Sequence, residues 1–318
     1  MTSFDAGHED LIHDVAYDFY GKRLVTCSSD QRLKVREFVE ETGVWEDVAT
    51  WKAHDGSILR VAWAHPEYGQ VIASCSFDRT VRIWEEQEHE PKNSDNRFGM
   101  RARLTESKSA VQDIEFAPNL HGLKLAAASA DGTIRMYEAM EVTNLKKWTP
   151  LEEFNVSGNV HMKEAEGNYC ISWCPSRFHA PMIAVGCGKE ARIYRQNAIN
   201  NWTAIITLSG HKDTIHDISW APAMGRSYQL IATASKDHTV RIYKLTPTES
   251  GYVFNVNTIA EFSDHGAEVW RVEWNITGTI LASSGDDGKV RLWKANYKGE
   301  WKWLSTIDYD KPRDLMEQ

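Results

Sequence analysis

Residues 72–84, IASCSFDRTVRIW, contain two short runs of alternating large and small side chains on either side of a turn at Asp78. A period of two is typical of strands, and an aspartate in such a short connection favours a hairpin. Residues 58–63, ILRVAW, show another apolar alternation, and His54 stands just before it. We therefore expect a histidine turn followed by three strands, the last of which ends at Trp84.

This unit recurs along the whole chain. The turn aspartates are Asp30, Asp78, Asp131, Asp237 and Asp287, at successive spacings of 48, 53, 106 and 50 residues. The widest gap spans two periods, and residues 187–194, CGKEARIY, fill it with a copy that has no aspartate. Units of this length with four strands each are typical of propeller blades. The sequence thus predicts an all-β propeller of six four-stranded blades over residues 1–308, followed by a polar tail over residues 309–318.

Four side chains recur as a set within these units: a histidine, a serine or threonine, the turn aspartate, and the aromatic residue that ends the third strand. The sets are His54, Ser74, Asp78 and Trp84; His211, Thr233, Asp237 and Tyr243; and His265, Ser283, Asp287 and Trp293. They resemble the hydrogen-bonded tetrad of WD40 repeats, which satisfies polar groups inside a blade. Arg36 takes the aromatic place in the first unit, and the fourth unit lacks both histidine and aspartate.

The same residue types also occur in Ser-His-Asp hydrolases. A catalytic triad is needed once, whereas these residues recur in several units, and none of the serines lies in a Gly-x-Ser-x-Gly turn. Cys170 and Cys174 could form half of a zinc site, but no second pair accompanies them. We therefore expect a structural role for the sets, no enzymatic activity, and neither a metal nor a cofactor.

The charge, the apolar runs and the cysteine count limit the classes of function and the cellular compartment that fit this chain. The 318 residues carry a formal net charge of −9 and no basic stripe, which gives direct nucleic-acid binding little support. No run approaches eighteen apolar residues, and the first residues form no apolar signal region, so we expect neither insertion into a membrane nor secretion. Five cysteines in a chain without a signal region indicate a reducing compartment.

The two ends of the repeat pattern bear on how the propeller closes. The chain begins in the innermost strand of unit one and finishes in the outermost strand of unit six, so no strand is left to exchange between them. Six units can close tightly, or they can leave a gap whose apolar faces invite the strands of a partner. The residues expected to line such a gap are Leu11, Ile12, Val15, Val290, Leu292, Trp301 and Trp303.

Several longer segments of the sequence point to a family. Three of them, DLIHD at residues 10–14, TCSSD at 26–30 and WAHPEYG at 63–69, resemble both the Seh-type nucleoporins and the Sec-type subunits of the COPII vesicle coat. Four others are similar to the Seh type: FAP at 116–118, RMYEA at 135–139, CISW at 170–173 and PMIAVG at 181–186. The resemblance covers nearly the whole chain.

The resemblance implies an open six-bladed ring, to which a large α-helical nucleoporin contributes a seventh blade in trans. It also implies a place among the other nucleoporins of the Y-shaped scaffold of the nuclear pore, at the nuclear envelope, where the pore supports transport of proteins and mRNA. A second implied assembly is the Seh-associated coat-like complex on the cytoplasmic face of the vacuole or lysosome, which regulates TOR signalling.

Two other functions stay open at this point. The chain could be a propeller of a COPII-type vesicle coat, or an adaptor that reads peptide motifs. Such a reader gathers basic side chains on one face, and Arg60, Arg79 and Arg271 are the candidates. The charged segment 85–100 is expected to be a solvated, mobile loop between strands rather than a binding tail.

Overall fold

The computed structural model describes residues 4–156, 168–177, 179–197, 201–248 and 254–308. Within these ranges the chain forms twenty-four strands, which hydrogen-bond into six separate four-stranded antiparallel sheets. The predicted all-β propeller of six four-stranded blades is therefore confirmed. The chain divides into two compact units, residues 1–167 and residues 168–318, and each unit holds three blades. No helix in the described ranges has the length and apolar character of a membrane-crossing segment. The predicted polar tail lies outside the described residues.

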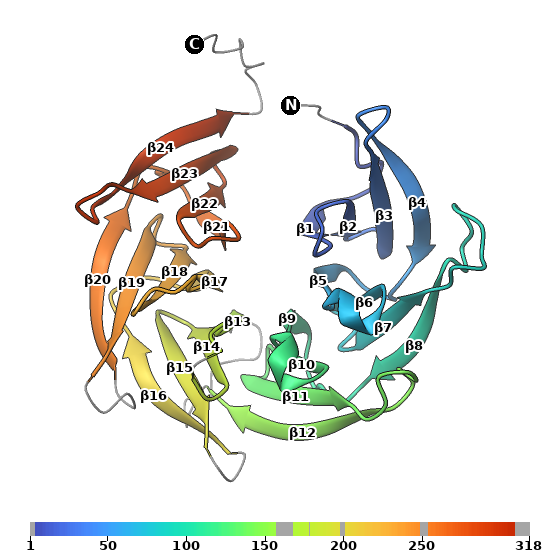
Figure 1. Ribbon diagram of the computed structural model, residues 1–318, viewed down its shortest axis with the longest axis horizontal. Coiled ribbons are helices and arrows are strands. Elements are labelled where there is room, and N and C mark those ends of the chain that lie inside the picture. Colours follow the sequence, from blue (N-terminus) through green and yellow to red (C-terminus); the bar gives the residue numbers. More distant parts are fainter. Residues whose placement is uncertain (1–3, 157–167, 178, 198–200, 249–253, 309–318) are drawn as a thin grey trace. The chain divides into compact units, whose positions relative to one another are not determined.

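In the first unit, each blade is a meander whose consecutive strands lie side by side (Figure 1). Blade one comprises β1 (Ile12–Tyr17), β2 (Arg23–Ser28), β3 (Arg32–Val39) and β4 (Val44–Lys52). Blade two comprises β5 (Ile58–Trp63), β6 (Val71–Ser76), β7 (Val81–Glu86) and β8 (Phe98–Leu104). Blade three comprises β9 (Val111–Phe116), β10 (Lys124–Ser129), β11 (Thr133–Ala139) and β12 (Trp148–Asn155).

The second unit repeats this arrangement three times. Blade four comprises β13 (Tyr169–Trp173), β14 (Met182–Cys187), β15 (Glu190–Gln196) and β16 (Trp202–Leu208). Blade five comprises β17 (Ile215–Trp220), β18 (Gln229–Ser235), β19 (Val240–Pro247) and β20 (Phe254–Phe262). Blade six comprises β21 (Val269–Trp274), β22 (Ile280–Gly285), β23 (Lys289–Ala295) and β24 (Trp301–Asp308).

The turn between the second and third strands shows why aspartate recurs there. In blade two, Asp78 Oδ1 accepts the backbone N–H of Thr80 (3.0 Å). Arg79, which lies between them, has a positive φ of 67°. In blade five, Asp237 Oδ1 accepts the N–H of Thr239 at the same distance. A short acceptor side chain that bonds the backbone two residues on stabilises such a turn. The sequence signal for the hairpin therefore has a direct local cause.

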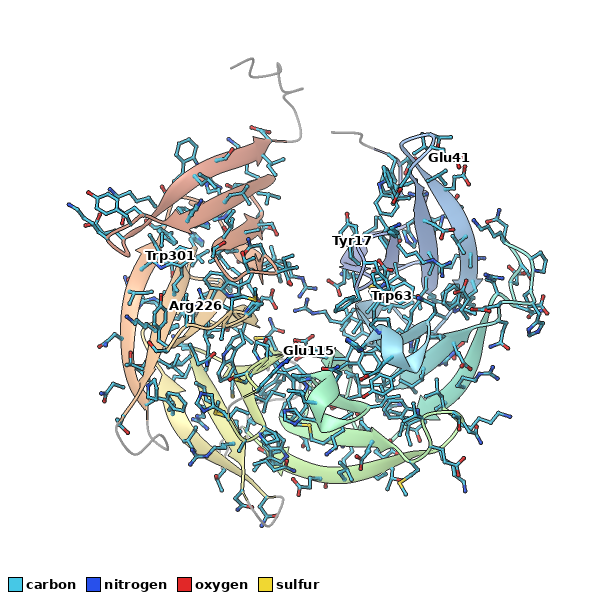
Figure 2. The ribbon with its side chains drawn as sticks, viewed as in Figure 1. Tyr17, Glu41, Trp63, Glu115, Arg226 and Trp301 are labelled. Carbon is cyan, nitrogen blue, oxygen red and sulfur yellow. The ribbon has the colours of Figure 1, made fainter. Side chains whose placement is uncertain are left out.

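Neighbouring blades of the first unit are joined by polar contacts between their innermost strands. Val61 of β5 donates its backbone N–H to Asp14 Oδ2 of β1 (3.1 Å). The Trp63 indole donates to the carbonyl oxygen of Ala16 (3.1 Å). Figure 2 labels Trp63 together with Tyr17, which ends the neighbouring strand β1. Strand β5 thus bonds strand β1 through one backbone amide and one indole.

The second unit uses the same two contacts. Val272 of β21 donates its backbone N–H to Asp217 Oδ2 of β17 (3.0 Å), and the Trp274 indole donates to the carbonyl oxygen of Ser219 (3.1 Å). Apolar side chains fill the space between the blades, so β6 of blade two and β18 of blade five are buried along their whole length. Burial on both faces of a sheet thus marks a blade that has a neighbour on each side.

The connection between β7 and β8 is anchored at its two ends. Residues 88, 89, 91–93, 95 and 96 are exposed, as expected for a solvated loop, whereas residues 85, 86 and 98–100 of the predicted loop belong to the strands. The Glu86 side chain is 4% exposed and pairs with Arg97 (2.7 Å) and with Arg23 of blade one (2.6 Å). Phe98 begins β8 and stacks on Trp51 of blade one, with ring centroids 4.9 Å apart. The Glu86 charge is therefore paired at the boundary between blades one and two, where a buried charge needs a partner.

We expect Arg97→Ala to lower the free energy of unfolding by about 1–2 kcal/mol, because it leaves the buried Glu86 carboxylate with Arg23 alone. Urea unfolding of the purified chain measures this change. Lys92→Ala is the matched control, since Lys92 pairs with Glu37 but is 52% exposed, and exposed pairs contribute roughly 0–1 kcal/mol. Equal losses in the two variants would contradict the anchored loop.

Candidate functional site

Blade two contains the hydrogen-bonded set that the sequence predicts. His54 Nδ1–H donates to Asp78 Oδ2 (3.0 Å), and Nε2 accepts from the Ser74 hydroxyl (2.8 Å). The Trp84 indole N–H in turn donates to Ser74 Oγ (3.0 Å). These bonds tie the turn before β5 to the strands and turn of the same blade, and they satisfy polar groups that are cut off from water.

Blade six repeats this arrangement with the same residue types. His265 Nδ1 lies 2.9 Å from Asp287 Oδ1, and Nε2 lies 2.8 Å from Ser283 Oγ. The Trp293 indole donates to Ser283 Oγ (2.9 Å). The last blade is thus as fully tied internally as an inner blade.

Blade five has a tyrosine in the aromatic place, and its bond differs. His211 Nδ1 lies 2.9 Å from Asp237 Oδ2, and Nε2 lies 2.6 Å from Thr233 Oγ1. The Tyr243 hydroxyl donates to the backbone carbonyl oxygen of Ser209 (3.3 Å). The tyrosine therefore fixes the segment just before the histidine.

Blade one forms a three-membered version of the set. His8 Nδ1 lies 2.7 Å from Asp30 Oδ2, and Nε2 lies 2.8 Å from Thr26 Oγ1. Arg36, which stands in the aromatic place, donates to the backbone carbonyl oxygen of Asp5 (2.8 Å). The arginine thereby holds the N-terminal segment against the blade, a role that sequence alone did not suggest.

The hydroxyl groups of these sets are shielded from water. Ser74 and Thr233 are 0% exposed, and Ser283 is 1% exposed. A catalytic nucleophile must reach its substrate, and these oxygens cannot. Their burial supports the structural interpretation over a hydrolase.

Burial and hydrogen bonding shift the pKa values of the set in blade two. Burial lowers the pKa of His54 from its ordinary value of 6.5, although Asp78 opposes this effect. For Asp78, burial alone would raise the pKa, but hydrogen bonds from His54 and Thr80 outweigh it and hold the pKa well below its ordinary value of 3.8. The folded state therefore favours a neutral histidine beside a charged carboxylate.

We expect the free energy of unfolding to fall as the pH drops below about 6.5. Both pKa values are lowered in the folded state, so both contributions are complete at higher pH and are lost on acidification, the histidine contribution first. Urea unfolding at pH 7.5, 6.5 and 5.5 tests this, and His54→Gln should flatten the pH dependence. His89→Gln, at a side chain 75% exposed, is the control. An unchanged slope in His54→Gln would contradict the assignment.

The first strand of blade one is exposed where the corresponding strands of other blades are buried. Ile12 and Val15 of β1 are 47% and 52% exposed. Ile58 and Val61, at the same register positions in blade two, are 0% and 4% exposed. The corresponding buried pairs in blades three, five and six are Val111 and Ile114, Ile215 and Ile218, and Val269 and Val272. The side of blade one formed by Ile12, Val15 and Tyr17, here called the blade-one face, is thus an uncovered apolar surface.

The segment before β1 covers only part of blade one. The Arg36 guanidinium lies over the Phe4 ring at 4.7 Å, and Lys34 donates to the carbonyl oxygen of Gly7. The segment forms no strand within residues 4–11. Leu11, directly before β1, is 71% exposed.

Blade six has an uncovered surface on the side of its sheet that does not pack on blade five. In β22, Leu281 is buried but Ile280 and Ala282 on the other side are only half-buried. In β23, Val290 and Leu292 are also half-buried. Val240 and Ile242, their counterparts in blade five, are both 0% exposed. The blade-six face is defined here as Ile280, Ala282, Val290, Leu292 and Ile307.

The prediction that Trp301 and Trp303 line this surface is wrong. Trp303 pairs across the ladder with Trp293, whose ring stacks on Phe262 of blade five at 3.8 Å. Paired residues of an antiparallel sheet point to the same side, and so do residues two apart on one strand. Trp303 and Trp301 of β24 therefore lie on the side toward blade five, and Figure 2 labels Trp301. The β24 residues on the other side are Ser305 and Ile307, opposite Leu292 and Val290.

The arginines considered for a peptide-reading face have structural positions. Arg60 is 15% exposed and forms ion pairs with Asp14 (3.5 Å) and Asp113 (3.0 Å). Arg79 occupies the tight turn of blade two, and Arg271 lies 4.0 Å from Asp217. Arg60, which two carboxylates already hold, is poorly placed to bind an acidic or phosphorylated peptide, whereas Arg79 is exposed.

The chain matches the family model of the WD domain, G-beta repeat, over residues 2–36, 45–85, 202–244 and 256–294. It is 47% identical to "Nucleoporin seh1" of Schizosaccharomyces pombe, an alignment that covers 99% of this chain and 98% of the relative. It is 42% identical to "Nucleoporin SEH1" of Saccharomyces cerevisiae, over 96% of this chain and 99% of the relative. It is 46% identical to human "Nucleoporin SEH1", over 94% of this chain and 86% of the relative.

Proposed function

This chain belongs to the nucleoporin SEH1 family of WD40 propellers, and we propose that it is a non-catalytic scaffold subunit of the Y-shaped subcomplex of the nuclear pore. It acts there at the nuclear envelope and contributes to the transport of proteins and mRNA. The names of the relatives support the nucleoporin role. The buried hydroxyls of the blade sets support the absence of catalysis.

The observation that carries the proposed mode of action is the exposure of two apolar sheet faces. Val15 is 52% exposed, whereas Val61 at the same position in blade two is 4% exposed. Leaving an apolar side chain of this size in water forgoes about 1.5–3 kcal/mol of burial free energy. An uncovered sheet face is thus a ready binding surface for another protein.

The partner that fits these surfaces supplies a blade of its own. The uncovered surfaces are faces of sheets rather than strand edges, and inner blades cover such faces with the sheet of the next blade. A large α-helical nucleoporin that donates a seventh blade in trans would cover the blade-one face and the blade-six face in this way. Other nucleoporins of the Y-shaped subcomplex would then contact the assembled pair.

We also propose a second assembly for the same chain. The Seh-type segments, such as RMYEA at residues 135–139, support membership of the Seh-associated coat-like complex that regulates TOR signalling on the vacuole or lysosome. A propeller whose binding surfaces are two blade faces can serve any partner that brings a matching blade. A COPII-type coat propeller is a competing function, since it uses the same fold.

The test is purification of the tagged chain from cells in buffer of low and then high salt, followed by mass spectrometry. We expect a stoichiometric α-helical nucleoporin that stays bound at high salt, because an interface of buried apolar surface is little screened. Recovery of coat subunits in its place would favour the COPII alternative. A weak peptide-bearing partner that salt removes would favour the peptide reader and contradict the scaffold role.

A further inference from the structure

A stack of side chains joins the innermost strands of the second unit. Asn168, directly before β13, donates its side-chain N–H to Nδ1 of His216 in β17 (2.9 Å). The His216 ring lies flat against the Trp270 ring of β21, with centroids 4.1 Å apart and planes inclined by 17°. The stack thus passes from blade four to blade five and from blade five to blade six.

Trp270 ends this stack within the described part of the chain. The His216 side chain, which Trp270 covers, is 8% exposed, whereas Trp270 itself is 44% exposed. One face of the indole lies on His216, so the other face is directed away from blade five. We call this second face of the ring the open indole face. A residue of a further innermost strand would cover it, as Trp270 covers His216.

The orientation of the Trp270 ring is fixed at its edge as well as on its covered face. The indole N–H donates to Asp286 Oδ1 (2.6 Å). The backbone N–H of Asp286 in turn donates to the carbonyl oxygen of Glu268 (2.9 Å), which holds the carboxylate beside the ring. A ring held in this way loses little conformational freedom when a ligand binds, so it is preorganised for a contact.

The charges around the ring leave one carboxylate without a cation. Glu268 lies 3.4 Å from His216 Nε2 and 3.6 Å from Lys236 Nζ. Burial lowers the pKa of His216, so its imidazole is neutral at pH 7, and Glu268 and Lys236 balance each other. Asp286 is exposed, and within the described residues no basic side chain pairs with it. A ligand of the open indole face therefore meets a net negative charge.

An arginine matches both the ring and the carboxylate. Its planar guanidinium can lie on the open indole face, where the ring attracts a cation, and can donate to Asp286 at the ring edge. An apolar or aromatic side chain would cover the ring but would leave the Asp286 carboxylate without water and without a donor. Blade one contains the same combination, because the Arg36 guanidinium lies over the Phe4 ring at 4.7 Å and pairs with Asp47.

We propose that the blade donated in trans places an arginine on the open indole face of Trp270 and pairs it with Asp286. This inference rests on the proposed function, because it names the chemistry of the partner blade that covers blade six. That blade would set its innermost strand beside β21, as β21 lies beside β17 through the bonds of Val272 and Trp274. Since Trp270 is the second residue of β21, the arginine should lie near the start of the donated strand.

The test uses the full chain and the α-helical nucleoporin that mass spectrometry identifies in its purified complex, both expressed in bacteria. Isothermal titration calorimetry compares the wild-type chain with Trp270→Ala and with Asp286→Asn. We expect Kd to rise about 30-fold in Trp270→Ala, as for an interfacial hot spot. Asp286→Asn keeps an acceptor for the indole but loses the charge, and should raise Kd about 10-fold. Trp303→Ala is the matched control: Trp303 is 59% exposed on the side toward blade five, so Kd should change less than about threefold.

A double-mutant cycle then identifies the partner residue. Each arginine of the donated blade is replaced in turn by methionine, and each variant is titrated against the wild-type chain and against Trp270→Ala. The arginine that contacts Trp270 should lose affinity for the wild-type chain but lose little more for Trp270→Ala, because contacting residues are not additive. If Trp270→Ala has a lowered melting temperature, Asp286→Asn takes its place in the cycle, since its exposed side chain has little effect on folding.

Two results would overturn the inference while leaving the proposed function intact. One is wild-type affinity in both Trp270→Ala and Asp286→Asn. The other is an additive loss for every arginine of the donated blade, which would show that Trp270 contacts a different residue type. Failure of the wild-type chain to bind any α-helical nucleoporin would overturn both the inference and the proposed function.

Discussion

Val15→Asp is expected to weaken binding of the α-helical nucleoporin partner roughly 100-fold or more, because an interfacial carboxylate without a cation must be desolvated. The free chain should be almost unaffected, because Val15 is 52% exposed and substitutions at exposed positions change stability by only about 0.5 kcal/mol. Calorimetric titration measures the affinity, and thermal melting of the free chain measures the stability. The combination of lost binding and retained stability is the signature of a binding surface.

Val61→Asp is the matched comparison on the next blade. Val61 occupies the same register position but is 4% exposed, so an aspartate there should prevent folding of blade two. Val15→Ile, which keeps the apolar side chain, should bind like the wild type. If Val15→Asp unfolded the chain as Val61→Asp does, blade one would already be covered in the free protein, contrary to the proposal.

Trp84→Ala should lower the free energy of unfolding by about 3–5 kcal/mol, the range for removing a buried tryptophan. The ring is 5% exposed and lies edge-on against Trp51 of blade one, with centroids 5.6 Å apart. The substitution also removes the indole donor that Ser74 accepts. Urea unfolding gives the change directly.

Two further variants separate the parts of this effect. Trp84→Phe keeps most of the ring but loses the N–H donor, so it should cost about 1–2 kcal/mol. Trp303→Ala should cost less than about 1 kcal/mol, since Trp303 is 59% exposed on the outer strand of blade six. If Trp303→Ala lowered the free energy of unfolding as much as Trp84→Ala does, the burial and hydrogen bond of Trp84 would not explain the effect of its removal.

The fold could be predicted because its signals are local and repeated. The aspartate of each tight turn bonds the backbone two residues on, as Asp78 does to Thr80, so the turn is readable from a few letters. In each histidine set the serine or threonine lies four residues before the turn aspartate, and hydrogen bonds join His54 to Ser74 and His265 to Ser283. Their agreement across blades is what made a structural role more plausible than catalysis.

The missed features depend on contacts between segments that are distant in sequence. The register shift in the ladder between Leu292 and Trp293 decides which residues of β24 point to which side of the sheet. No residue type in the sequence indicates where this shift occurs. The sequence also does not show that Glu86, at the end of β7, is buried and paired with Arg23 of another blade. From the sequence, Arg36 is only a residue that replaces the aromatic member of the set. Its hydrogen bond to the N-terminal segment is visible only in the structure.

The exposed residues of the candidate site could be predicted from the sequence only in part, for a related reason. Ile12 and Val15 have the same apolar character as the buried pair Ile58 and Val61, so the sequence shows a core-like strand in both blades. Only the exposure of each strand shows which pair has a neighbour and which does not. The ends of the repeat pattern gave only the hypothesis of uncovered faces, and the structure shows which residues of blades one and six are exposed or half-buried.

Hydrogen exchange of the free chain and of its complex tests the central claim most directly, namely that a partner blade covers the blade-one face and the blade-six face. We expect backbone amides of β1, β22 and β23 to gain protection when the partner binds, because covering a sheet suppresses its local opening. Amides of β6 and β18, buried along their length, should change little. Full protection of β1 and β22 in the free chain, or new protection confined to the inner blades, would contradict the account.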